Sequence, residues 1–234
     1  EYTETDNQPY LANSALTSLI KSCNLYLNNK LVMSFNEHFG IQQFIELTLN
    51  FDNSTVASRL ANQGFYSPSD IEKQKNKFKG GKRVELLAKL NLLNCEKYLI
   101  PNVSFGLKLT LQNQNFVIVE QKKTTKSTDK TTDVITKSSS KIVIDDMRLL
   151  LRHITVTPDY LHHLELSLSK QPAVYETKYG MIVTSTIPSN QSTYSISSLY
   201  NNVKPSLLLL CFMENSTMTN DEVDPLIFTH YGLK

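Results

Sequence analysis

The 234 residues contain no tryptophan, and glycine and proline are sparse, at 7 and 8. These low counts exclude collagen-like repeats and the glycine- and proline-rich sequences that stay disordered. Turn formation falls instead to asparagine, serine and threonine. With 40% hydrophobic and 20% charged residues, the composition is that of a folded globular chain.

A surplus of charge of one sign is also lacking, because the formal net charge is +2. A domain dedicated to nucleic acid usually has a clear basic surplus, so near-neutrality argues against one. No run of 18 apolar residues occurs, and the longest candidate, residues 207–213, is far too short to span a bilayer. Residues 1–10 lack the layout of a signal peptide.

The sequence contains only three cysteines, Cys23, Cys95 and Cys211. They lie far apart in the sequence, and none forms a CxxC motif. This spacing predicts free, buried thiols in a reducing compartment. Four N-x-S/T sequons favour the opposite setting, a secreted glycoprotein. In a chain this rich in asparagine, serine and threonine, however, such sequons are expected by chance. They begin at Asn53, Asn102, Asn190 and Asn215.

Alternation of apolar and polar residues predicts that most of the regular structure is β-strand. The clearest case is residues 105–111, where Phe105, Leu107, Leu109 and Leu111 alternate strictly. At the rise of a β-strand this segment is about 25 Å long. A hairpin is predicted at 22–32, with its turn at Asn28-Asn29. Further strands are predicted at 84–93, 116–119, 142–144, 147–156, 179–187, 207–212 and 226–231.

Helices are predicted only in the connections between strands, at 39–51, from 53 or 54 to 60, and at 160–168. The polar, lysine-rich residues 67–82 are predicted to be a surface loop. Many short strands with a few intervening helices favour an all-β sandwich of the jelly-roll type, with short helices in its loops.

Residues 122–141, KKTTKSTDKTTDVITKSSSK, contain almost no core-forming side chain and are interpreted as a flexible loop or linker. Six lysines against two aspartates allow at most weak contact with nucleic acid there. The strand clusters on either side predict two jelly rolls. The first, 1–121, is expected to lack its N-terminal strands, and the second, 142–234, to be incomplete.

Motifs for catalysis are incomplete. Residues 78–83 are basic and contain glycine but lack the first glycine and the Ser/Thr of a phosphate-binding loop. Ser104 lies in N-V-S-F-G, which lacks the first glycine of a nucleophile elbow. His162 and His163 are adjacent, so on a helix their side chains point about 100° apart and cannot share one metal ion. The other histidines are isolated at positions 38, 153 and 230.

The prediction is therefore a protein with no catalytic, cofactor-binding or metal-binding residues, and not an enzyme. The larger aromatic residues on apolar faces are expected to be core rather than a stacking platform for bases. They are Phe44, Phe105, Phe116 and Phe212.

The order of several short segments along the chain resembles that in a known protein family. The series includes QFIELTLNF at 43–51, YLIPNV at 98–103, LLLRHITVTP at 149–158 and PLIFTHYGL at 225–233, with others at 16–20, 24–32, 84–93, 105–111, 186–188, 199–200 and 205–212. In this order the segments resemble the double-jelly-roll major capsid proteins of Polinton/Maverick elements and their adintovirus relatives. The chain departs from that family in its 122–141 insert.

The resemblance implies a homotrimer that forms pseudo-hexagonal capsomers in an icosahedral shell, assembled inside an infected host cell. Neighbouring capsomers, penton proteins and minor capsid proteins would be its partners, with no small-molecule substrate and no membrane span. A capsid gene taken over by a host is a variant of this hypothesis. The alternative is a secreted or cell-surface jelly-roll module that binds glycan or a protein, and a hydrolase or metal-dependent enzyme ranks third.

Overall fold

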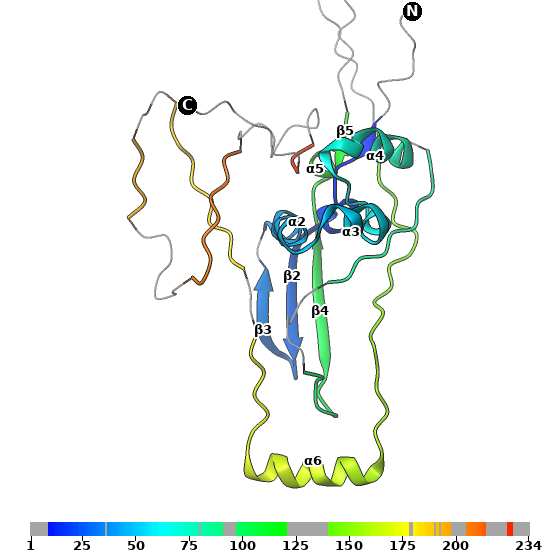
Figure 1. Cartoon of the computed structure of the whole chain (residues 1–234), viewed down its shortest axis with the longest axis vertical. Helices are drawn as coiled ribbons and strands as arrows, with labels where there is room; N and C mark the ends of the chain where they lie inside the picture. The colour runs from blue at the N-terminus through cyan, green and yellow to red at the C-terminus, as the bar shows by residue number, and fades with distance from the viewer. Residues whose placement is uncertain are drawn as a thin grey trace, which may run out of the picture.

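The structure is a computed structural model. It describes residues 9–35, 37–79, 81–90, 97–120, 140–177, 180–189, 191, 193–197, 205–213 and 224–226. Within these residues, all strands and all helices but one lie between Tyr10 and Val119 (Figure 1).

A three-stranded antiparallel sheet with the order β3-β2-β4 is the largest β-structure. β2 (Ile20–Leu27) and β3 (Lys30–Phe35) form a hairpin, and β4 (Phe105–Leu111) pairs with the other edge of β2. Asn28 and Asn29 connect the hairpin with φ of 48° and 60°, a left-handed conformation that asparagine tolerates well. The predicted hairpin and the predicted strand at 105–111 are both confirmed.

The two faces of this sheet differ in polarity because its strands alternate. One face, called here the apolar face, contains Cys23, Leu25, Met33, Phe35, Phe105, Leu107 and Leu109. Phe39, at the start of the next helix, closes one end of this face with its ring 5.5 Å from that of Phe35. The opposite face has polar residues, and there the Ser34 hydroxyl donates to Asn24 Oδ1 at 2.7 Å.

Short helices and a two-stranded sheet cover one end of the strands (Figure 1). β1 (Tyr10–Leu11) pairs with β5 (Ile118–Val119). The helices are α1 (Ala15–Ser18), α2 (Phe39–Asn50), α3 (Asn53–Ser58), η1 (Leu60–Gln63), η2 (Pro68–Asp70), α4 (Ile71–Phe78) and α5 (Gln114–Val117). Both helices predicted between residues 39 and 60 are confirmed, and an Asp52 carboxylate oxygen caps the second by accepting from the Thr55 N–H at 3.1 Å.

The predicted surface loop at 67–82 is wrong, because η2 and α4 occupy most of it. Gln74 and Phe78 are buried, and the Phe78 ring packs edge-on against Tyr66 at 6.2 Å. Lysines dominate the composition of this segment and concealed these two inward positions. A short helix with few apolar residues still forms because tertiary packing stabilises it.

Two predicted strands differ from the structure. Residues 84–90 run extended with alternating exposure but join no ladder, while 91–93 lie outside the described residues. In the segment 116–119, only Ile118–Val119 is a strand, since Phe116 and Val117 belong to α5. Both these residues are nevertheless buried, as their apolar character predicts.

The later part of the chain contains one described helix, α6 (Pro158–Lys170), which confirms the helix predicted at 160–168. It crosses the far end of the molecule, reached by two long extended segments (Figure 1). In the described residues beyond 140, the segments predicted as strands run extended without a ladder. Apart from residues 140 and 141, the predicted linker 122–141 lies outside the described residues, as do all of 226–231 but Leu226.

The described architecture is therefore β-containing, with small sheets accompanied by helices, a coarser result than an all-β double jelly roll. The helices of residues 39–78 pack on one another and on the end of the sheet, and they contribute much of the buried core. Among the helices described, none has both the length and the apolar character needed to cross a membrane.

Candidate functional site

The histidines considered as ligands lie apart from one another. His162 and His163 are exposed on α6 with ring centroids 6.3 Å apart, His153 is exposed on an extended segment, and His38 precedes α2. His230 lies outside the described residues. Within the part of the chain that the structure describes, no three His, Cys, Asp or Glu side chains come close enough to hold a metal ion.

Ser104 contacts the hairpin turn rather than a catalytic partner among the described residues. It is exposed next to the hairpin turn, where its N–H donates to Asn28 Oδ1 at 2.9 Å and its hydroxyl lies 3.4 Å from the same oxygen. In return, the Asn28 N–H donates to the Ser104 carbonyl at 2.9 Å. These contacts fix the start of β4 against the hairpin, and an asparagine amide oxygen is no general base.

A shallow hollow of about 640 Å³ lies beside the polar face of the sheet, lined by Lys21, Ser22, Glu37, His38, Thr110, Ile182 and Thr184. On its wall, Lys21 Nζ and a Glu37 carboxylate oxygen are 3.4 Å apart. Both side chains are well exposed, so the two charges neutralise each other in a solvated setting. The hollow could admit a polar small molecule, but its lining offers no activated nucleophile.

Among the described residues, Asp224 carries a deeply buried carboxylate, with 2% of the residue exposed. Its Oδ2 accepts from the Asn13 N–H at 2.7 Å and from Gln74 Nε2 at 3.1 Å, and its Oδ1 accepts from the Leu226 N–H at 2.9 Å. Burial raises the pKa of Asp224 above its usual value, and the three N–H donors oppose that rise. Asp224 also contributes, after burial, to raising the pKa of Tyr10 to about 12.

Asn13 joins this carboxylate to the N-terminal segment. Its side-chain Oδ1 accepts from the N–H groups of Ser14 and Tyr66, and its Nδ2 donates to the Tyr66 carbonyl at 2.8 Å. Next to Asp224, Leu226 is 1% exposed and packs in the cluster that includes Phe44 and Phe116. Residues 224–226 thus form a clasp that holds a late segment of the chain against the first helices.

Sequence reasoning missed this clasp. A three-residue segment has no periodicity to read, and an aspartate before a proline is typical of a loop. Its one signal is the apolar Leu226, which the sequence placed at the start of a strand. Within the described residues, the polar partners of Asp224 are N–H donors, and they hold the segment in place.

The predictions of buried cysteines and buried phenylalanines hold for described residues before 120 and fail for those after 140. Cys23 is fully buried, and burial raises its pKa to about 11, whereas Cys211 is exposed and Cys95 lies outside the described residues. Phe44 and Phe116 are buried as predicted, and Phe105 packs partly buried on the apolar face. Phe212 is exposed, so its prediction as core is wrong for this chain alone.

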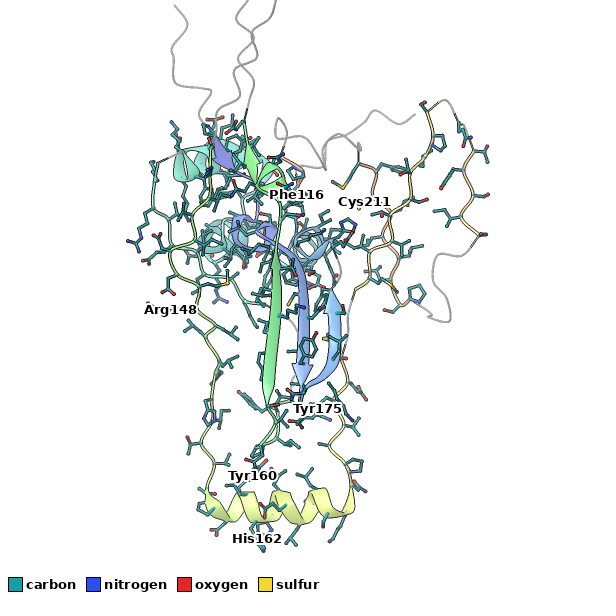
Figure 2. The ribbon with its side chains drawn as sticks, turned by 180° about the vertical axis from the view of Figure 1, so that it is seen from behind. Phe116, Arg148, Tyr160, His162, Tyr175 and Cys211 are labelled. Carbon is teal, nitrogen blue, oxygen red and sulfur yellow. The ribbon has the colours of Figure 1, made fainter. Side chains whose placement is uncertain are left out.

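Most large apolar residues described between 140 and 213 are exposed. The segments that contain them stand apart from the packed helices and sheet (Figure 2). Leu210 is 79% exposed and Leu150 is 74% exposed. α6 contains no buried residue, although Leu161, Leu164 and Leu168 form a half-exposed stripe along one side. The exposed large apolar residues of this part are Val143, Ile144, Met147, Leu149, Leu150, Leu151, Ile154, Tyr160, Leu166, Val174, Met181, Val183, Ile187, Tyr194, Ile196, Leu207, Leu208, Leu209, Leu210 and Phe212.

Polar contacts join part of this region to the domain, the name used here for residues 9–120, on both sides of α6. Near its start, Arg83 Nε lies 3.4 Å from an Asp145 carboxylate oxygen. Near its end, the Tyr175 hydroxyl accepts from the Ile100 N–H at 2.9 Å and donates to the Tyr98 carbonyl at 3.2 Å. Residues 146–173 between these anchors, called here the distal arm, project from the domain and contain α6 (Figure 1).

No protein-family model, curated protein or solved structure matches this chain. In the described residues, the exposed apolar segments form an unusual surface, and exposed apolar surfaces mark contacts between proteins.

Proposed function

We propose that the chain is a structural virion protein, a major capsid protein whose trimers form pseudo-hexameric capsomers of an icosahedral shell. The observation that carries the proposal is the exposed apolar surface of residues 140–213. A soluble monomer rarely exposes contiguous apolar patches beyond a few hundred Å². A protein that works only in an assembly exposes such a surface until its neighbours cover it.

The backbone of these segments supports the same proposal. Extended segments outside a ladder leave N–H and C=O groups that must be hydrogen-bonded when the adjacent side chains become buried. Association with other strands supplies the apolar cover and the hydrogen bonds together. The residues 142–234, proposed as the second jelly roll, would complete their sheets in this way.

The three-stranded sheet suits half of a sandwich, because one face is apolar and the other polar. Phe105, Leu107 and Leu109 on the apolar face are only partly buried, which leaves room for a second layer. The ordered resemblance to Polinton/Maverick capsid proteins supports the same assignment. Location in the virion, contacts with penton and minor capsid proteins, and absence of enzymatic activity belong to the proposal.

The test is the solution mass of the purified chain by light scattering, with negative-stain imaging of the same peak. Trimers with a hexagonal outline, or closed shells, are expected. A well-folded monomer at micromolar concentration would contradict the proposal.

A matched pair of variants sharpens this test. Replacing Leu208 and Leu210 by aspartate adds two negative charges to the exposed apolar surface, and this variant is expected to lose the oligomer. Lys89→Asp changes the net charge equally at an exposed position of the first part, and it is expected to keep the oligomer. Loss of the oligomer in both variants would indicate a general effect of charge.

A secreted or cell-surface module that binds glycan or a protein is the second candidate. Asn102 favours it, since this sequon asparagine is exposed in a turn with φ of 62° and could be reached by the glycosylation machinery. Expression through a secretory pathway followed by mass spectrometry decides between the two. A glycan on Asn102 in a monomer that binds a glycan array would favour the module.

A further inference from the structure

We infer that residues 147–156 of the distal arm add as a β-strand to the free edge of β4 in a second copy of the chain. This inference deepens the proposed function, and it rests on it because both require self-association. The occupant is a second copy, and the contact is an exchanged strand.

β4 provides the more suitable of the two sheet edges. Within the described residues it pairs only with β2, so its outer N–H and C=O groups face no strand. Its seven residues alternate strictly between the two faces. The other edge, β3, has a register irregularity in its middle, opposite Leu25 and Tyr26, and such bulges protect edge strands from further pairing. The irregularity in the pairing of β4 lies at its end, at Leu111, and leaves the rest of that strand regular.

The arm has a pattern that fits this edge. Met147, Leu149 and Leu151 alternate along one side of an extended segment, and Arg148, Leu150 and Arg152 lie on the other side. A register that places the first three on the apolar face would cover the half-buried Leu107 and Leu109. The two arginines would then lie on the polar face near the like-charged Lys108, so salt is expected to tighten the contact by screening.

The arm's own domain does not cover it. Among the described residues, the hydrogen bonds and ion pairs of 146–173 join only residues of the arm, such as Arg148 to Asp146 at 2.6 Å. The two extended segments of the arm run past the end of the three-stranded sheet to α6 (Figure 1). Each copy therefore has one uncovered arm and one uncovered edge, and exchange covers both without another protein.

The exposed apolar area of residues 147–156 would form a large part of such an interface. Five large apolar residues of this segment are between 44% and 74% exposed. At roughly 100 Å² each, they provide about 500 Å² of the ~800 Å² per partner that a stable interface buries. They are Met147, Leu149, Leu150, Leu151 and Ile154.

The test is disulfide cross-linking between two differently tagged populations of the full chain. Cys95 and Cys211 are replaced by serine in both, while the buried Cys23 is retained. One population contains Leu150→Cys and the other Thr110→Cys or Lys108→Cys, positions that the proposed strand pairing would place opposite one another. Mild oxidation is expected to link the two tags at least about tenfold more than in the control pairing of Leu150→Cys with Val32→Cys on β3.

Two results would overturn the inference. One is an oligomer in which Leu150→Cys never links to β4 of the other tag, which would leave the proposed function standing. The other is a link that forms only inside a single chain carrying both substitutions. A folded monomer, with Cys23 unreactive toward a thiol reagent, would contradict the proposed function together with the inference.

Discussion

The two parts of the molecule have similar side chains and different surroundings. Leu25 in β2 is fully buried, whereas Leu210 in an extended segment of the later part is 79% exposed. Both lie in extended apolar stretches of the sequence. The difference lies in the neighbours, since β2 is paired on both edges and the described later segments form no ladder.

The route of the chain explains one pairing of the first part. A two-residue turn at Asn28-Asn29 places β2 and β3 side by side at small entropic cost. Sequence distance alone does not prevent a ladder, because β2 also pairs with β4, which is far away in the sequence. The extended segments before and after α6 form no ladder although only the helix separates them, and a second copy of the protein could supply strands for them.

The same substitution in each part gives the largest expected contrast. Leu25→Ala leaves a cavity in the apolar face and is expected to lower the free energy of unfolding by about 2–5 kcal/mol. Leu150→Ala removes a side chain that is 74% exposed, so in dilute monomer it is expected to change that free energy by less than about 0.5 kcal/mol. Urea unfolding of both variants measures this. Equal losses would show that Leu150 packs inside a core of its own chain.

The clasp is the next test, because it joins the two parts through buried groups. Asp224→Ala leaves the N–H groups of Asn13 and Leu226 and the Gln74 amide without their acceptor. Buried donors without partners cost about 1–3 kcal/mol, and thermal unfolding should show a loss of this size. An unchanged melting temperature would indicate that residues 224–226 detach readily.

The pH dependence of the clasp follows from the raised pKa of Asp224. A carboxyl group whose pKa is higher in the folded than in the unfolded state binds its proton more tightly when folded. Its contribution is therefore fully present below the usual value of 3.8 and declines as pH rises through the folded-state pKa. Urea midpoints of the native chain should fall relative to those of Asp224→Asn from acid toward neutral pH. The opposite trend would show that the three N–H donors hold the carboxylate ionised.

Local signals predicted the first part well. Asn28-Asn29 marked the hairpin turn, the alternation from Phe105 to Leu111 marked β4, and the apolar spacing around Phe44 marked α2. Each is encoded within about ten residues. α4 was missed because Gln74 and Phe78 are its only buried residues, and their burial depends on Leu11, Tyr66 and Asp224 from elsewhere in the chain.

The candidate site was less accessible to sequence reasoning. Alternation identified the segments 147–156 and 207–212 as apolar and extended, but it does not state what covers them. Phe212 was expected in a core for this reason. The clasp could not be predicted either, because it joins Asn13 to Asp224 across 211 residues, and no periodicity relates such distant positions.

The smallest expected effect concerns the ion pair at the base of the distal arm. Arg83 and Asp145 are both largely exposed, so a double-mutant cycle with alanine at each should give a coupling free energy below about 1 kcal/mol, decreasing with salt. Ile142, three residues earlier, packs against the core cluster of Phe44 and Phe116, and its replacement by alanine is expected to cost more. A coupling free energy well above 1 kcal/mol would show that the charge pair, rather than the packing of Ile142, fixes the point where the arm leaves the domain. The arm's direction would then depend on salt even before any second copy binds it.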